Sequence, residues 1–288
     1  MIETHPIFRS DYYAAMPHQK IRRSLELGPR YYFRDVPRYW HERRRSAGQL
    51  IDLDLQVLWN PLHEFGFLGK EPLEPPPGLD GVLDRLNAEG LRIMLKPERF
   101  LAVCTQFWRA AQGDASILEC GSYQGATGLA LALLGKLHGF SQHVHLFDLF
   151  GSQAEIMSAP VDGARTANEF AMEAGYADDL RRLADKLGVG DRVTVHDGLF
   201  EETFPGFVAG PFPCRFAHID ANYYSSTLQA CKFVMPLLAD RAIVVFDDYH
   251  GITDLGARLA IDQVFGTAQG AIRRLSGTSA VLTFERNA

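Results

Sequence analysis

Short apolar, β-branched runs alternate with segments of helical length through the second half of the chain. The runs cover 116–122, 143–149, 192–198, 215–220 and 242–248, and the helical segments cover about 126–138, 165–187, 225–238 and 254–265. This alternation is typical of βαβ units, in which a crossover helix returns the chain to the same end of the sheet. The sequence therefore predicts five parallel strands.

Two further runs, AIRRLSG (271–277) and SAVLTF (279–284), are joined through Gly277 and Thr278. A parallel pair needs a crossover of about a dozen residues, so a connection this short permits only an antiparallel hairpin. The prediction is an α/β fold with a seven-stranded sheet, made of five parallel strands and a C-terminal antiparallel hairpin.

The chain changes character near residue 112. Before that point, arginine and aromatic residues gather in 30–45, the proline-rich stretch 71–78 indicates an extended connector, and 97–111 has the apolar spacing of an amphipathic helix. We predict a mainly helical extension over 1–112 and a sheet domain over 113–288. The Tyr/Arg clusters of the extension form either a lid or dimer arm, which favours a homo-oligomer, or helices packed on the core; they are Tyr12, Tyr13, Tyr31, Tyr32 and Arg43 to Arg45.

Composition limits the partners. The 29 Lys+Arg residues against 35 Asp+Glu give a formal net charge of −6, so no overall basic field attracts nucleic acid. A secretory signal and a membrane span are not predicted, and a cytoplasmic location is expected. The four cysteines lack CxxC spacing and are expected to be buried and reduced: Cys104, Cys120, Cys214 and Cys231.

The first predicted strand ends in a glycine-rich turn, ECGSYQGATG, that leads directly into a helix. Glycines allow a ligand to approach the backbone, and the helix N-terminus offers N–H groups. Because the turn is longer than the G-x-G-x-x-G of dinucleotide enzymes, NAD is disfavoured. A purely structural tight turn is the alternative. The cofactor-binding candidates here are Glu119, Gly121, Ser122, Tyr123, Gly125 and Thr127, with Glu119 suited to a positively charged amino acid end.

Acidic residues also end the second and third predicted strands. Asp148 stands where a carboxylate can accept hydrogen bonds from both hydroxyls of a ribose, although an Asp that caps the following segment is the alternative. Asp197 and Gly198 are candidates for lining an adenine pocket. Together with the glycine turn, these positions favour a nucleoside ligand.

Carboxylates gather after the fourth and fifth predicted strands. Parallel neighbours bring their carboxyl ends to one rim of the sheet, where unpaired carboxylates would repel one another and a hard divalent cation, Mg²⁺ above all, would neutralise them. Carboxylates that cap two helices are the alternative. The predicted metal ligands are Asp220, Asp247 and Asp248.

These segments together resemble the macrocin O-methyltransferase family of S-adenosylmethionine- and Mg²⁺-dependent enzymes that methylate sugars and natural products. The likeness covers about residues 93–284 and is carried by ECGSYQGATG, HLFDLF, HDGLFEETFP, HIDANYYSST, VVFDDYHG and GARLAIDQVF. It implies a class I methyltransferase (Rossmann-like) fold acting on a small-molecule hydroxyl, as in antibiotic biosynthesis. S-adenosylmethionine would lie over the glycine turn, with Glu119 near its methionine end and Asp148 on its ribose. Asp220 would bind both the cofactor and the metal ion.

One position departs from the family. Its members usually have a second acid two residues after the first metal ligand, which is thought to act as general base, whereas this chain has Asn222. An amide cannot accept the proton. We predict His250 as the substitute base, with Asn222 and His218 positioning the acceptor. Alternatively, the metal lowers the pKa of the hydroxyl enough for water to serve.

Two other functions remain open from the sequence. Asn222 is compatible with an S-adenosylmethionine-binding homologue in which methyl transfer is altered or lost. A nicotinamide-dependent oxidoreductase uses a similar doubly wound sheet, although the longer glycine turn counts against it.

Overall fold

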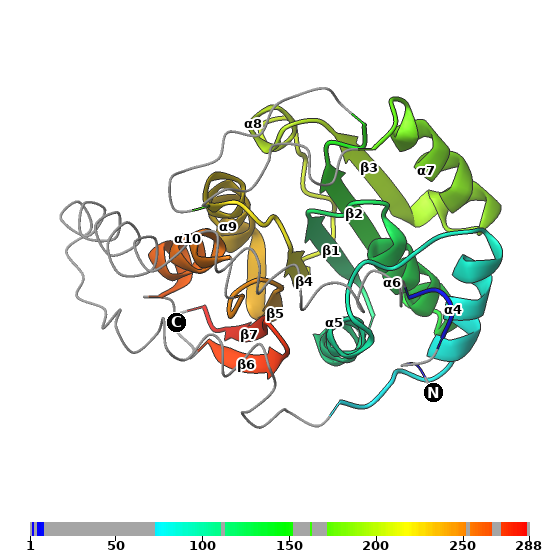
Figure 1. Cartoon of the computed structure of the whole chain (residues 1–288), viewed down its shortest axis with the longest axis horizontal. Helices are drawn as coiled ribbons and strands as arrows, with labels where there is room; N and C mark the ends of the chain where they lie inside the picture. The colour runs from blue at the N-terminus through cyan, green and yellow to red at the C-terminus, as the bar shows by residue number, and fades with distance from the viewer. Residues whose placement is uncertain are drawn as a thin grey trace, which may run out of the picture.

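The computed structural model describes residues 2, 5–8, 73–110, 113–151, 162, 172–251, 254–266 and 272–286. Its centre is a seven-stranded sheet with the strand order β3-β2-β1-β4-β5-β7-β6 (Figure 1). The strands are β1 (Ala115–Cys120), β2 (Gln142–Asp148), β3 (Val193–Asp197), β4 (Cys214–Ile219), β5 (Leu238–Phe246), β6 (Arg273–Ser276) and β7 (Ser279–Phe284). Strands β1 to β5 are parallel, and β7 is antiparallel to both β5 and β6. The predicted strand arrangement is confirmed.

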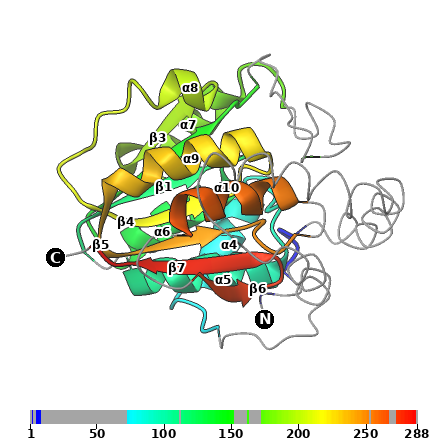
Figure 2. The same cartoon turned by 90° about the vertical axis from the view of Figure 1, so that its left-hand side faces the viewer.

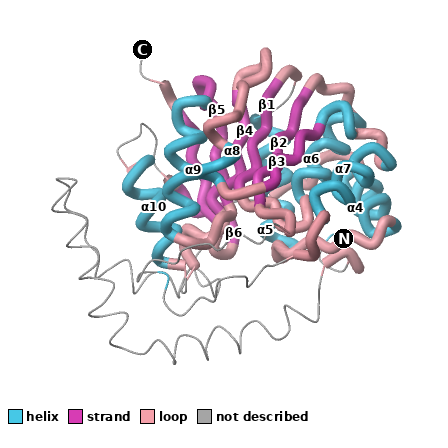
Figure 3. The backbone as a smooth tube through the Cα atoms, turned by 90° about the horizontal axis from the view of Figure 1, so that it is seen from above, coloured by secondary structure: helices cyan, strands magenta, loops and turns pink. Residues whose placement is uncertain are grey.

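Helices cover both faces of the sheet (Figures 2 and 3). On one face lie α4 (Leu79–Ala88), α5 (Pro97–Ala110), α6 (Ala126–Leu137) and α7 (Tyr176–Lys186); on the other lie α8 (Phe200–Thr203), α9 (Tyr224–Leu237) and α10 (Leu255–Phe265). A short 3₁₀ helix, η4 (Gly190–Arg192), precedes β3. The structure is therefore a three-layer α/β arrangement.

The central strand β1 explains why the sequence runs are so apolar. All six of its residues are buried, because both faces of a parallel sheet are covered by helices. Ile117 belongs to the core with α4 to α7, whereas Leu118 and Cys120 belong to the core with α9 and α10. The alternation of side chains therefore points Glu119 toward the face that α5 and α6 cover.

Two element starts differ from the predicted ones by more than two residues. The helix predicted over 165–187 begins only at Tyr176, after the N-cap Gly175, so the prediction is wrong for 172–175, and 163–171 lie outside the described residues. Strand β5 starts at Leu238, four residues before the predicted start at 242. The pairing of β5 with β4 shifts register before Ile243, and Arg241 has a φ of 59°, so an irregularity precedes the regular strand.

The described part of the predicted extension shares the core of the sheet. Phe107 of α5 makes an edge-to-face contact with Phe216 of β4, with ring centroids 5.9 Å apart. Phe8 packs in the same way on Phe100, with centroids 5.7 Å apart. The Tyr/Arg clusters at 12–45 lie outside the described residues, so the division at 112 and the lid or dimer arm stay predictions.

All four cysteines are buried and unbonded, as predicted. Burial raises the pKa of each thiol, to about 12 for Cys214, so none is a ready nucleophile. Among the described helices, none combines the length and the apolar character that crossing a bilayer requires.

Candidate active site

The strand ends meet at one rim because backbone hydrogen bonds continue the sheet beyond the strands. The donor and acceptor pairs are Gly121 N to Phe147 O (2.9 Å), Asp220 N to Cys120 O (2.8 Å), Asp247 N to Ile219 O (3.0 Å) and Gly198 N to Asp148 O (3.1 Å). The glycine turn and the acidic segments, which are far apart in the sequence, are thereby brought side by side.

Packing explains the glycines of the turn. Gly121 has a φ of +89°, and a Cβ there would overlap with the carbonyl of Asp220. Gly125, at the N-cap of α6, has a φ of +74°, and a Cβ would lie 2.7 Å from the Leu180 side chain. Packing and backbone conformation are therefore enough to require glycine at both positions, whether or not a ligand binds. The ligand-binding role of the turn stays a prediction. Among the described residues, no side chain caps the N-terminus of α6.

Asp148 ties the end of β2 to the glycine turn. Its Oδ2 accepts a hydrogen bond from the Tyr123 N–H, and its Oδ1 accepts one from the Leu149 N–H, both at 2.6 Å. Burial raises the pKa of Asp148 to about 6, against the lowering effect of these N–H donors. A carboxylate oxygen can accept more than one hydrogen bond, so Asp148 keeps capacity for ribose hydroxyls. Asp197 is exposed and lies in register beside Asp148.

Glu119 lies against a histidine. It is in register with His218 on β4, and its Oε1 is 3.1 Å from His218 Nδ1, with both side chains buried. Gly128 makes room for this carboxylate, because a Cβ there would lie 2.8 Å from Glu119 Oε2. Within the described ranges, Glu119 Oε2 and His218 Nε2 are buried without a hydrogen-bond partner. Ser122 and Thr127 are also buried at the turn.

Three of the predicted or neighbouring polar groups converge. His218, Asp220 and Asp247 each offer one ligand atom, and these atoms lie within 4.8 Å of one another. Burial and the charge of Asp248 raise the pKa of Asp220 to about 7, although His218 and Arg99 lower it. The donor set, with two carboxylates and a ring nitrogen, is compatible with a divalent cation.

Arg99 of α5 is a site residue that sequence reasoning missed. Its Nε donates to Asp247 Oδ1 at 2.9 Å, and its terminal nitrogen pairs with Asp247 Oδ2 and lies 3.5 Å from Asp248 Oδ1. Ser279 Oγ also donates to Asp247 Oδ1, at 2.9 Å. A buried guanidinium from a distant helix therefore neutralises Asp247, a partner that the sequence prediction did not include.

Two of the three residues predicted near the acceptor, Asn222 and His250, occupy particular backbone positions. Asn222 has a φ of 59°, a left-handed conformation that asparagine tolerates better than most residues. His250 is buried, its backbone N–H donates to Thr278 O at 2.8 Å, and its ring packs edge-on against Tyr249. His250 is not part of the group formed by His218, Asp220 and Asp247. The catalytic roles of Asn222, His218 and His250 stay predictions.

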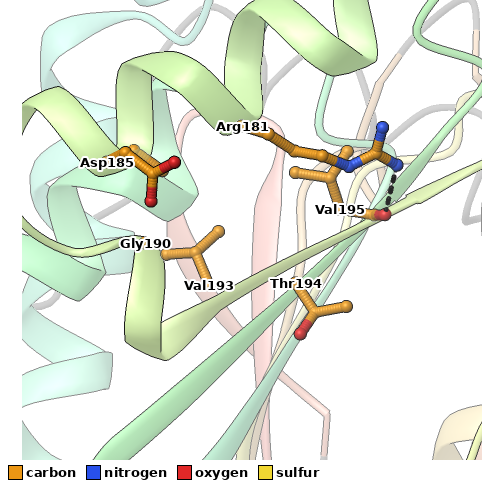
Figure 4. A pocket seen from close by; sticks show the side chains of 7 residues that line it. Arg181, Asp185, Gly190, Val193, Thr194 and Val195 are labelled. Carbon is orange, nitrogen blue, oxygen red and sulfur yellow. Dashed lines mark hydrogen bonds between the residues drawn. The ribbon is translucent and has the colours of Figure 1, made fainter.

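A pocket of about 280 Å³ lies away from this rim, between α7 and the start of β3 (Figure 4). It is lined by Arg181, Ala184, Asp185, Gly190, Val193, Thr194 and Val195. Arg181 donates to the carbonyl of Val195 at 3.0 Å across it. Because Asp197 ends β3 at the rim, the pocket at Val193 belongs to the other half of that strand and not to the candidate active site.

Comparison with known proteins agrees with this geometry. Residues 118–249 match the family model described as a methyltransferase domain. The chain is 25% identical over 210 residues to the 8-demethyl-8-(2,3-dimethoxy-alpha-L-rhamnosyl)-tetracenomycin-C 4'-O-methyltransferase of Streptomyces olivaceus, which covers 69% of this chain and 78% of that protein.

Solved structures share the fold. Calicheamicin methyltransferase CalS11 matches with a TM-score of 0.57 and 19% identity, over 81% of this chain and 94% of that one. The O-methyltransferase NovP matches with a TM-score of 0.53 and 15% identity, over 82% of this chain and 100% of that one. The fold is that of a class I methyltransferase. The predicted fold class is confirmed. The comparisons do not reach the narrower macrocin family.

Proposed function

We propose that this protein is an S-adenosylmethionine-dependent O-methyltransferase of the macrocin type, with a hydroxyl of a sugar or another natural product as acceptor. The observation that carries the proposal is the match of 118–249 to a methyltransferase domain, which spans both the glycine turn and the acidic rim. The name of the relative from Streptomyces olivaceus describes methylation of a sugar-bearing natural product. This supports the proposed acceptor class and the proposed role in antibiotic biosynthesis.

In this proposal the β1–β2–β3 half of the rim binds the cofactor, which supplies a methyl group on a sulfonium. Asp148 would accept hydrogen bonds from the ribose hydroxyls, since its oxygens keep acceptor capacity beside the Tyr123 and Leu149 N–H groups. Glu119 Oε2, a buried carboxylate oxygen without a partner among the described residues, suits the ammonium group of the methionine end. Asp197 and Gly198 would border the adenine.

The β4–β5 half of the rim would bind the acceptor hydroxyl. Asp220 and Asp248 would hold a divalent cation there, beside Asp247, which pairs with Arg99. Such an ion lowers the pKa of a bound hydroxyl. The carboxylates and His218 would fix the acceptor oxygen for in-line attack on the methyl carbon. His250 would take the proton in place of the acid that Asn222 replaces, with Asn222 and His218 positioning the acceptor.

The test combines binding and turnover. Calorimetric titration with S-adenosylmethionine and, separately, NAD⁺ should give micromolar binding of the first and none of the second. Transfer of a radiolabelled methyl group should then be assayed on a panel of rhamnosides and nucleotide-linked sugars, with Mg²⁺ or with EDTA. Failure to bind S-adenosylmethionine would overturn the proposal.

Two variants assign the base. His250→Gln should lower turnover at least about tenfold while S-adenosylmethionine affinity stays unchanged, because general-base catalysis contributes about 10²-fold or more. Asn222→Asp separates a degenerate base from a rewired one, since a large gain of turnover would show that the acid had been lost. Undiminished turnover of His250→Gln would eliminate His250 as the base.

A further inference from the structure

Arg99 is built into the acidic rim by elements outside the matched methyltransferase region. It belongs to α5, which packs on β5 and β6, and its guanidinium binds Asp247. The stem of its side chain lies against the hairpin turn, because a Cβ on Gly277 would lie 3.3 Å from Arg99 Cγ. Ser279, just after that turn, donates to the same Asp247 oxygen. Arg99, Gly277 and Ser279 all lie outside 118–249.

The guanidinium of Arg99 places a positive charge beside the rim. Both oxygens of Asp247 have protein partners, so this carboxylate is already neutralised without a metal ion. Asp248 lies 3.5 Å from Arg99 through Oδ1, while its Oδ2 is buried without a partner in the part of the chain that the structure describes. The rim therefore contains a satisfied carboxylate beside carboxylates that still need a positive charge.

We propose that Arg99 is a positioning residue that acts as a built-in counter-ion. It takes Asp247 out of metal coordination and lowers the affinity of the rim for a divalent cation, so that Asp220 and Asp248 carry the negative charge that a cation balances. The inference rests on the metal role in the proposed function. It makes Arg99 the residue that sets how strongly this site depends on metal.

The test measures Mn²⁺ binding, with free Mn²⁺ counted by electron paramagnetic resonance, in five folded proteins: the wild type, Arg99→Gln, Arg99→Lys, Asp247→Asn and the double variant Arg99→Gln/Asp247→Asn. Arg99→Gln should bind Mn²⁺ at least about tenfold more tightly than the wild type, because a positive charge beside the site is removed. The double variant removes the ion pair as a neutral unit and should stay within about threefold of the wild type. Arg99→Lys, which keeps the charge, should also stay within about threefold.

If Arg99 had only a structural role, Arg99→Gln would bind Mn²⁺ as tightly as the wild type or more weakly, because the substitution would only loosen the rim. Loss of Mn²⁺ binding in the double variant would identify Asp247 as a ligand and overturn the proposal. Absence of Mn²⁺ binding in every folded variant would also overturn it. Where Arg99→Gln does not fold, comparing Asp247→Asn with the double variant measures the same charge effect, and the double variant should bind at least about tenfold more tightly.

The same samples are titrated with S-adenosylmethionine. This distinguishes the two proposals, because loss of cofactor binding by the wild type would defeat the proposed function, whereas the Mn²⁺ results address Arg99 alone.

Discussion

The two halves of the rim neutralise a carboxylate in different ways. In the β1–β2 half, Asp148 accepts hydrogen bonds from two backbone N–H groups, one from the next residue and one from the glycine turn. In the β4–β5 half, Asp247 is held by the side chains of Arg99 and Ser279, which come from α5 and β7. Backbone N–H dipoles offer Asp148 only partial charges, whereas a guanidinium places a full positive charge beside Asp247. The first half thus suits a ligand with hydroxyl donors, and the second suits controlled binding of a cation.

The largest effect is expected where one partner of the buried ion pair is removed. Arg99→Gln leaves Asp247 buried without its cation and should lower the free energy of unfolding by about 3–5 kcal/mol. The double variant Arg99→Gln/Asp247→Asn should lose much less stability, because two uncharged amides replace an ion pair whose net charge is zero. Urea denaturation measures both. The exposed pair of Arg182 and Asp179 is the control, because Arg182→Gln should change stability by about 0.5 kcal/mol or less.

Gly121, which joins the two halves, is expected to give the next largest effect. Gly121→Ala should lower the free energy of unfolding by about 3 kcal/mol, because the new Cβ meets the Asp220 carbonyl and φ is +89°. Gly139→Ala is the matched control, with a φ of +68° and nothing within 4 Å of the added Cβ. It should lose about 1 kcal/mol from backbone strain alone. Equal losses in the two variants would argue against close packing between the turn and β4.

The cofactor half is tested through the pH dependence that its carboxylate allows. Asp148 has a pKa of about 6, so S-adenosylmethionine affinity should fall as pH drops from 8 to 5, when the carboxylate is protonated. Asp148→Asn should bind about tenfold or more weakly at pH 8 and should not show that pH dependence. Because the pKa in the folded state is raised, Asp148 stabilises the fold at low pH, and that stabilisation is lost as pH rises through about 6. A wild-type affinity that is flat from pH 8 to 5 would contradict the role of Asp148.

Local signals in the sequence were sufficient for one half of the rim and not for the other. The strands, the hairpin at Gly277 and the position of Asp148 beside the glycine turn follow from periodicity and from turns of a few residues. Arg99 and Asp247 are 148 residues apart, and no spacing rule connects an arginine on an amphipathic helix with an acid after a strand. The available signal was weak: Arg99 lies one helical turn before Val103, on a buried face of α5.

Irregular backbone accounts for the difference between the predicted and the observed start of β5. The left-handed residue Arg241 precedes the regular part of β5, and Asn222 is also left-handed. The residue type rarely predicts such a backbone conformation, because tertiary packing selects it. The acids of the rim were therefore predictable as a group, but not which of them is already neutralised.

The smallest expected effect compares two buried serines, one in each half. Ser279 Oγ donates to the Asp247 carboxylate at 2.9 Å, whereas Ser122 Oγ donates to the neutral carbonyl of Glu119 at 3.4 Å. Hydrogen bonds to charged groups are stronger, so Ser279→Ala should lose about 1.5 kcal/mol of unfolding free energy and Ser122→Ala about 0.5 kcal/mol. Urea denaturation of both variants measures the difference. A larger loss for Ser122→Ala would mean that Arg99 alone satisfies Asp247, and that the hairpin contributes packing but no useful donor to the rim.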